Sequence, residues 1–313
     1  MSTPINKPRG QSIRLFLVDG TASGLIVASI PNWTGSIVVG RSVQLIELLG
    51  RAEAKRAGCY ILQGEDPSHP MGVRAYIGQA ARIEERLKTH ARQRDWWDTA
   101  AIVTTSDTNF TAGHFLALES KMIQVANENG RAAIENQISP NSFAGGLGEA
   151  DQADMESFFD QLRLVLPVLG FNVLKDSVAK KADRDPVSVS DTDEILEISH
   201  KSGVRAKALI RDDEFIVLEG SLALTESPYQ SNGYAALRQG LIDQGVLVPD
   251  SSSSFLRFTR DTAFSSSSAA AAVVLNRQSS GPKEWRFPLR GQSLGAWQEE
   301  QARFLGETEE AAE

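Results

Sequence analysis

The chain has 313 residues, 41% hydrophobic and 23% charged, which predicts about two globular domains and excludes general disorder. The single cysteine excludes an internal disulfide and a zinc site built on several cysteines. The sequence has neither an apolar signal core nor an apolar run of membrane length, so we expect a cytoplasmic protein with no membrane partner. The formal net charge of −8 argues against a nucleic-acid partner, because binding a phosphate backbone favours a basic surface.

Residues 1–50 predict a small β-rich N-terminal module. Ile13, Leu15 and Leu17 stand at every second residue, Asp19-Gly20 predicts a turn, and further apolar runs follow at 25–30 and 37–39. We therefore expect this module to precede the more strongly patterned part of the chain.

Residues 51–145 show the clearest secondary-structure pattern. Short apolar runs predict strands at 58–62, 73–77 and 100–104. Apolar residues at helical spacing predict helices over 82–94 and 111–127, the second one ended by Asn129-Gly130. This block is expected to form one domain.

The remainder predicts a linker, a second domain and a tail. Residues 146–193 read as a helix followed by a charged linker, residues 194–290 as a separate C-terminal α+β domain, and residues 291–313 as an acidic, frayed tail. The serine runs 251–254 and 265–268 lack a nearby histidine or a nucleophile motif, so we expect flexible loops there.

Two of the predicted strands carry similar tripeptides, Gly58-Cys59-Tyr60 and Tyr76-Ile77-Gly78. Alone, these fit a hairpin that happens to carry two tyrosines. The helix that follows adds Arg82, Arg86 and His90 at intervals of four, which places them on one face.

The same helix has a local charge of +3, from two acidic and five basic residues. The basic residues are Arg82, Arg86, Lys88, Arg92 and Arg94. A solvated basic face is one interpretation and a nucleic-acid-binding face is the other.

Glu119 lies within the apolar arc of the helix predicted over 111–127. Setting Phe115 at 0°, a rotation of about 100° per residue puts Glu119 at about 40°, between Ala126 and Ile123. A buried carboxylate without a partner is costly, so Glu119 must meet a metal, an arginine or water at the helix edge. An arginine-paired structural carboxylate is the alternative to a metal ligand.

Together these residues resemble the GIY-YIG nuclease superfamily over residues 51–140. The matching residues are Gly58-Cys59-Tyr60, Tyr76-Ile77-Gly78, Arg86, His90, Leu118-Glu119-Ser120 and Glu135-Asn136. The chain departs from the family at Cys59, where isoleucine is usual. Strand alternation turns Cys59 away from the tyrosines, so we expect this change to affect packing only.

The resemblance implies an α/β (α+β) fold with a small three-stranded antiparallel sheet flanked by helices, in which Gly58 and Gly78 are structural motif residues. It also implies a metal-dependent endonuclease that hydrolyses phosphodiester bonds in DNA, with RNA left open, in defence, repair or mobile-element biology. Glu119 would bind one Mg²⁺ or Mn²⁺, because magnesium is commonly held by one or two carboxylates and several waters.

The implied catalytic residues are Tyr60, Tyr76, Arg86, His90 and Asn136. Tyr60 resembles the family's candidate general base, and it would need nearby positive charge to act near neutral pH. Arg86 would hold a nonbridging phosphate oxygen, Tyr76 and His90 would position water or the leaving group, and Asn136 would order the site. The nucleic-acid-binding residues would be Arg82, Lys88, Arg92 and Arg94.

The C-terminal block resembles a domain of unknown function that often follows GIY-YIG modules in bacterial proteins, on residues 203–208, 264–266 and 269–275. A catalytically idle nucleic-acid-binding module, and a regulatory protein whose C-terminal domain binds a protein partner, stay open as alternatives. The acidic residues concentrate outside the predicted site helix, which weakens the charge objection. The net charge of −8 still predicts weak nonspecific DNA affinity and a restricted substrate or a recruiting partner.

Overall fold

The structure is a computed structural model that describes residues 10–136, 146–177, 194–212, 214–226, 233–251 and 254–310. Residues 304–310 are described by their backbone only. Most of the expected linker and the end of the expected nuclease domain, residues 178–193 and 137–145, lie outside the described residues. The chain divides into two compact units, Met1–Glu65 with Arg74–Lys175, and Asp66–Val73 with Asp176–Glu313. Each unit is described by itself.

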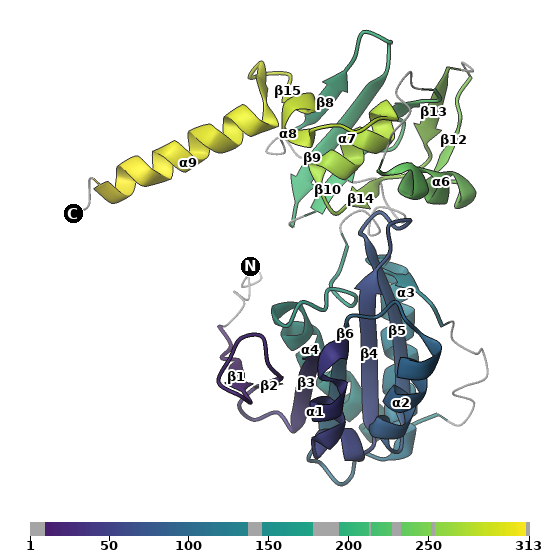
Figure 1. The fold of residues 1–313 in the computed structure, drawn as a ribbon, viewed down its shortest axis with the longest axis vertical. Helices are drawn as coiled ribbons and strands as arrows, with labels where there is room; N and C mark the ends of the chain where they lie inside the picture. The colour runs from purple at the N-terminus through teal and green to yellow at the C-terminus, as the bar shows by residue number, and fades with distance from the viewer. Residues whose placement is uncertain are drawn as a thin grey trace, which may run out of the picture. The chain divides into compact units, whose positions relative to one another are not determined.

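The first unit is built on a seven-stranded sheet with the order β1-β2-β3-β6-β4-β5-β7 (Figure 1). Its strands are β1 (Arg14–Leu17), β2 (Ile26–Ser29), β3 (Gly35–Arg41), β4 (Gly58–Glu65), β5 (Val73–Ala80), β6 (Thr99–Thr105) and β7 (Ala133–Ile134). The last strand, β7, runs parallel to β5 and covers only its first part.

The three strands expected for residues 51–145 are present as β4, β5 and β6, but within this larger sheet. Strand β3 pairs antiparallel with β6 along its whole length, from Gly35 opposite Thr105 to Arg41 opposite Thr99. Both Ile37 and Val38 are fully buried, so β3 is covered on both faces, as expected for a strand in the interior of a sheet. The N-terminal strands are therefore part of the first unit and not a separate module.

Helices cover both faces of this sheet (Figure 1). Helices α1 (Leu45–Gly50) and α2 (Ile83–Gln93) supply Leu48, Ile83 and Leu87 to a core cluster that includes Tyr60 of β4. The neighbouring residue Cys59 instead places its Sγ 3.4 Å from the carbonyl oxygen of Phe115 in α3 (Ala112–Asn129). Helix α4 (Glu149–Val168) packs beside α3. The prediction that Cys59 faces away from Tyr60 is confirmed.

The ends of α3 follow the sequence signals. Thr111 and His114 form a reciprocal capping arrangement at its first turn. Gly130 terminates it in the left-handed conformation, with φ of 60°, as the Asn129-Gly130 pair predicts. The long helix that carries Glu119 is thus fixed at both ends by local chemistry.

The second unit is mixed α/β, with a six-stranded sheet of order β14-β10-β9-β8-β15-β16 and a three-stranded sheet of order β11-β13-β12. Its strands are β8 (Leu196–Ser199), β9 (Arg205–Arg211), β10 (Glu214–Val217), β11 (Leu222–Leu224), β12 (Leu247–Pro249), β13 (Phe255–Phe258), β14 (Thr262–Phe264), β15 (Arg286–Phe287) and β16 (Gln292–Ser293). Its helices are α6 (Ala235–Asp243), α7 (Ser267–Leu275), α8 (Gly281–Glu284) and α9 (Leu294–Glu310). Residues 269–275 of α7 are all buried.

Two expectations are wrong in this unit, the flexible loop at 265–268 and the frayed tail. Within the run 265–268, Ser266 caps α7 by accepting a hydrogen bond from the Ala269 N–H at 3.1 Å, and Ser268 accepts one from the Gly281 N–H at 3.0 Å. The acidic tail forms helix α9, which begins at the buried Leu294 and is rich in glutamate, glutamine and alanine. No helix in the described part of the chain is both long and apolar enough to cross a membrane.

We predict that Gly58→Ala destabilises the first unit. A Cβ at residue 58 would lie 2.3 Å from the carbonyl oxygen of Val103 and 2.9 Å from Cδ1 of Ile83, so the backbone must shift. We expect a loss of about 1–3 kcal/mol in the free energy of unfolding, measured by urea denaturation with circular dichroism. Gly50→Ala is the matched control because a Cβ there meets nothing within 4 Å. Equal midpoints for the two variants would contradict the prediction.

Candidate active site

Three rings from three elements meet on the face of the sheet that α2 covers. Tyr60 of β4 and Tyr76 of β5 have ring centroids 6.1 Å apart and nearly parallel planes. The ring of His90 on α2 is tilted against both, with centroid distances of 5.4 Å to Tyr60 and 4.7 Å to Tyr76. The structure therefore brings these three predicted residues together.

Gly78 makes room for the Tyr60 ring. A Cβ at residue 78 would lie 2.4 Å from Oη and 2.5 Å from Cζ of Tyr60. Any side chain at residue 78 would displace this hydroxyl, which explains why glycine stands there.

Tyr60 is fully buried, and its hydroxyl lies 2.8 Å from Nε2 of His90. Burial raises the pKa of Tyr60, and the neighbouring Tyr76 raises it further, while the Arg86 guanidinium offsets part of the rise. The expectation that positive charge lowers this pKa is thus met only in part, because burial outweighs the charge of Arg86. In the unliganded protein Tyr60 is a neutral phenol.

Arg86 lies one turn before His90 on α2 and is exposed. Its guanidinium interacts with the hydroxyls of Tyr60 and Tyr76, and it also acts electrostatically on the carboxylate of Glu119. Arg86 is therefore the cation shared by residues of β4, β5 and α3.

Glu119 reaches the site from α3, where it is partly buried. Its Oε1 accepts a hydrogen bond from the backbone N–H of Gln79 at 3.1 Å, next to Gly78. Burial raises the pKa of Glu119, while the Gln79 N–H and Arg86 oppose that rise. The carboxylate thus meets both a hydrogen bond and an arginine's charge, as a residue in an apolar arc must.

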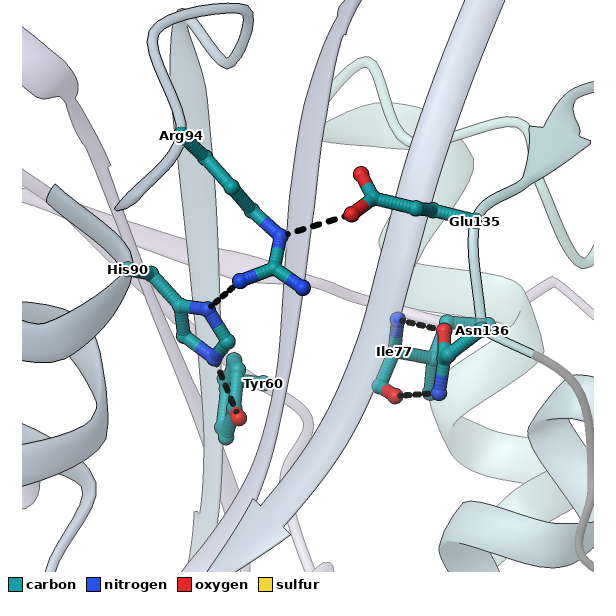
Figure 2. A network of polar contacts seen from close by, with 6 residues as sticks. All are labelled: Tyr60, Ile77, His90, Arg94, Glu135 and Asn136. Carbon is teal, nitrogen blue, oxygen red and sulfur yellow. Dashed lines mark hydrogen bonds and ion pairs between the residues drawn. The ribbon is translucent and has the colours of Figure 1, made fainter. Parts of the chain in front are cut away.

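Asn136 occupies the edge of β5 just beyond the end of β7 (Figure 2). Its side-chain oxygen accepts from the Ile77 N–H at 3.1 Å, and its side-chain nitrogen donates to the Ile77 carbonyl oxygen at 2.6 Å. One residue earlier, the Glu135 N–H donates to the carbonyl oxygen of Ala75 at 2.9 Å. The amide of Asn136 thus continues the strand pairing with its side chain, which is an ordering role.

The predicted nucleic-acid-binding residues do not form one free basic face. Arg82 pairs with Glu84 and lies 3.4 Å from Glu85, and Lys88 lies 3.6 Å from Glu84. Within the described residues, Arg92 is exposed and has no acidic partner. These pairs reduce the charge that α2 offers to a phosphate backbone.

Arg94 belongs to the site rather than to the basic face. It donates to Oε1 of Glu135 at 2.9 Å and lies 2.7 Å from Nδ1 of His90 (Figure 2). Its guanidinium also lies over the Tyr76 ring, 4.6 Å from the centroid. The sequence signal was available, because Arg94 continues the spacing of four from Arg86 and His90. Glu135 had no role in the sequence prediction because its partner lies on another element.

We predict that His90 makes the first unit less stable below neutral pH. Burial, followed by the charges of Arg94 and Arg86, lowers the pKa of His90 to about 4, against an ordinary value of about 6.5. Between these values the unfolded chain binds a proton that the folded chain does not. Stability is therefore complete above about pH 6.5 and falls as the pH drops towards 4, by up to about 3 kcal/mol.

The measurement is urea unfolding at several pH values between 4 and 7.5, compared with His90→Gln. Glutamine retains hydrogen-bonding groups without titrating in this range. The variant is expected to show a shallower pH dependence, and parallel curves would contradict the assignment.

Residues 196–298 match a family described as a domain of unknown function (DUF4357). No curated protein matches the chain, and no solved structure matches it. The match lies in the second unit, whereas every residue of the candidate site lies in the first. The comparisons thus identify a domain at residues 196–298 and leave the chemistry to the geometry of the site.

Proposed function

We propose that the first unit is a metal-dependent endonuclease of the GIY-YIG type that hydrolyses phosphodiester bonds, with DNA as its substrate. The observation that carries the proposal is the position of Arg86. One exposed guanidinium interacts with Tyr60, Tyr76 and Glu119, which come from three other elements. A cation that acts on two hydroxyls and a carboxylate supplies groups that phosphodiester hydrolysis needs.

Glu119 is the residue proposed to hold the metal ion. Its Oε1 accepts a hydrogen bond from the Gln79 N–H, and no described residue donates a hydrogen bond to its Oε2. Among the described residues no cluster of three or more histidine, cysteine or acidic side chains could hold a metal. This donor set fits magnesium, which keeps several waters and completes its shell with substrate phosphate. A bound ion would lower the pKa of a water and offset phosphate charge.

In the proposed reaction a water oxygen attacks phosphorus, the bond from phosphorus to one ester oxygen breaks, and that leaving oxygen takes up the proton that the water loses. Arg86 binds a nonbridging oxygen through its planar fork. Tyr76 lines the side of the site that α2 covers and positions water or the leaving group, while His90 acts through its hydrogen bond to the Tyr60 hydroxyl. Asn136 holds the β5 edge, so that the Gln79 N–H stays aimed at Glu119.

The raised pKa of Tyr60 refines its role. A buried phenol does not act as a base in the unliganded protein, so Tyr60 orients water through its hydroxyl, and only further positive charge in the site would lower its pKa. Loss of the hydroxyl alone, in Tyr60→Phe, therefore tests this role with little change in volume.

The charge distribution supports a restricted substrate. Acidic partners already neutralise part of the basic charge of α2, and the whole chain carries a net charge of −8. Nonspecific affinity for a phosphate backbone should therefore be weak and sensitive to salt. We assign recruitment to the C-terminal domain, as a binding module for a protein partner or a particular nucleic-acid structure.

The second candidate is a nucleic-acid-binding module that does not cleave. The complete burial of Tyr60 favours it, because a buried hydroxyl is poorly placed to meet water. A salt-dependent gel shift without any cleavage would select this candidate. Plasmid, single-stranded DNA, branched DNA and RNA, each offered with Mg²⁺ and with Mn²⁺, form the panel that separates the two.

We predict that Glu119→Gln and Tyr60→Phe abolish metal-dependent nicking of plasmid DNA. Removing the charged ligand should cost several kcal/mol of transition-state stabilisation, which is more than about 100-fold in rate. Glu128→Gln is the matched control, because Glu128 lies on the same helix and is exposed. Wild-type rates in Glu119→Gln would refute the metal role.

We predict that Arg86→Ala lowers the cleavage rate by about 30- to 10³-fold, or roughly 2–4 kcal/mol, as expected for losing one charge-stabilising donor. Arg86→Lys should recover part of the rate, because it restores the charge without the fork. Arg14→Ala, an exposed arginine on the edge strand β1, is the control. Equal rates for Arg86→Ala and Arg14→Ala would remove Arg86 from the mechanism.

A further inference from the structure

We propose that Arg94, anchored by Glu135, is a positioning residue that fixes the tautomer of His90 and thereby makes the Tyr60 oxygen a hydrogen-bond acceptor. The geometry is a chain of four side chains, in which Glu135 meets Arg94, Arg94 meets His90, and His90 meets Tyr60 (Figure 2). The consequence for cleavage rests on the proposed function. The tautomer itself is a property of the unliganded protein.

The tautomer follows from the kinds of groups in contact. A guanidinium has only N–H donors, so its contact at 2.7 Å requires Nδ1 of His90 to be an acceptor. A neutral imidazole that accepts at Nδ1 carries its proton at Nε2. Nε2 must therefore donate to the Tyr60 oxygen, which lies 2.8 Å away.

The other two protonation states of His90 conflict with its surroundings. A proton at Nδ1 would face an N–H of Arg94, donor against donor. A doubly protonated ring would add a cation beside Arg94 and Arg86 in a buried position, and these causes together lower the pKa of His90 to about 4. Only the Nε2–H form remains near neutral pH.

The groups that face His90 from each packed element agree with this state. Helix α2 itself contributes Arg86 and Arg94, β4 contributes Tyr60, and β5 contributes the Tyr76 ring at 4.7 Å. None of these four carries a carboxylate. Glu135, the one carboxylate among the four hydrogen-bonded side chains, contacts Arg94 and acts on His90 through it.

Arg94 is held well enough to enforce this arrangement. Its Nε donates to Glu135, another nitrogen donates to His90, and the plane of the group lies over the Tyr76 ring. Three different contacts fix a planar cation in position and orientation. This use of the guanidinium also removes Arg94 from the residues available to bind phosphate.

The consequence concerns the direction of the Tyr60 proton. Because the Tyr60 oxygen accepts from His90, its own proton must point to another acceptor. His90 therefore cannot remove the Tyr60 proton, and it instead stabilises negative charge that develops on that oxygen. Fixing this direction in advance avoids reorganisation when substrate binds.

The test is long-range ¹H–¹⁵N NMR of the histidine rings in the full chain at about pH 7, without metal or nucleic acid. The His90 signals are assigned by their absence from the spectrum of His90→Gln. The wild type should show protonated Nε2 and unprotonated Nδ1. Arg94→Met should populate the Nδ1–H form and raise the pKa of His90, and Arg94→Lys should restore the Nε2–H form at least in part. Arg14→Met is the control that removes an exposed arginine elsewhere.

Glu135→Gln provides a second variant in case Arg94→Met does not fold. It frees Arg94 without removing it, so a mixture of tautomers is expected, whereas Glu128→Gln should leave the wild-type spectrum unchanged. A wild-type Nδ1–H signal, or an unaltered tautomer and pKa in every folded variant at Arg94 and Glu135, would overturn the proposal.

Cleavage kinetics supply an independent readout. Arg94→Met should lower kcat by up to about 10²-fold with little change in KM. The acid limb of the plot of kcat against pH should move to higher pH. A raised KM and a reduced salt dependence, with the tautomer unchanged, would instead make Arg94 a phosphate-binding residue. If the wild type shows no cleavage, the NMR result still decides the tautomer, so the two proposals fail separately.

Discussion

The hydroxyl of Tyr60 belongs to a fully buried side chain and lies against the backbone of a neighbouring strand. This position is possible only because residue 78 has no side chain. A buried hydroxyl requires a partner inside the protein, and His90 is that partner. The imidazole in turn needs its second nitrogen satisfied, which brings in Arg94, and a partly buried guanidinium requires Glu135. The positions of His90, Arg94 and Glu135 thus follow from the burial of one phenol.

The free edge of β5 is the second constraint on the site. The short strand β7 pairs with only the first part of β5, so the backbone groups at residues 77 and 79 would otherwise lack partners on that side. Asn136 satisfies the first of these and Glu119 the second. The backbone alternates along a strand, so these partners are spaced two residues apart on one edge. Two side chains thus do what a longer strand would do, and the carboxylate gains a fixed position.

Much of this arrangement was predictable from local pattern. The strands β4, β5 and β6, the helices α2 and α3 and the termination at Gly130 all follow from apolar periodicity and turn residues. The unusual position of Glu119 was visible from helical geometry alone. These features depend on neighbours within one or two turns of the chain, where sequence spacing determines which side chains share a face.

Two of the errors in the sequence prediction share one physical origin, which is partnering across long separations. The alternation in residues 12–39 predicts strands but cannot say that β3 joins β6, about 65 residues later. The assignment of Arg94 to a basic face failed because Glu135 approaches it from beyond α3. The run Ser265–Ser268 was misread because serine favours loops and helix caps for the same reason, its competition for backbone hydrogen bonds.

The burial of Cys59 has a practical consequence. It is the only cysteine in the chain, its side chain is fully buried, and burial raises the pKa of its thiol well above the ordinary value. A thiol in that state reacts slowly with alkylating reagents, because the thiolate is the nucleophile. The native protein therefore serves directly as a background for spectroscopy. A cysteine introduced at an exposed position can carry a fluorophore or spin label without first replacing Cys59, which neighbours Tyr60 of the site.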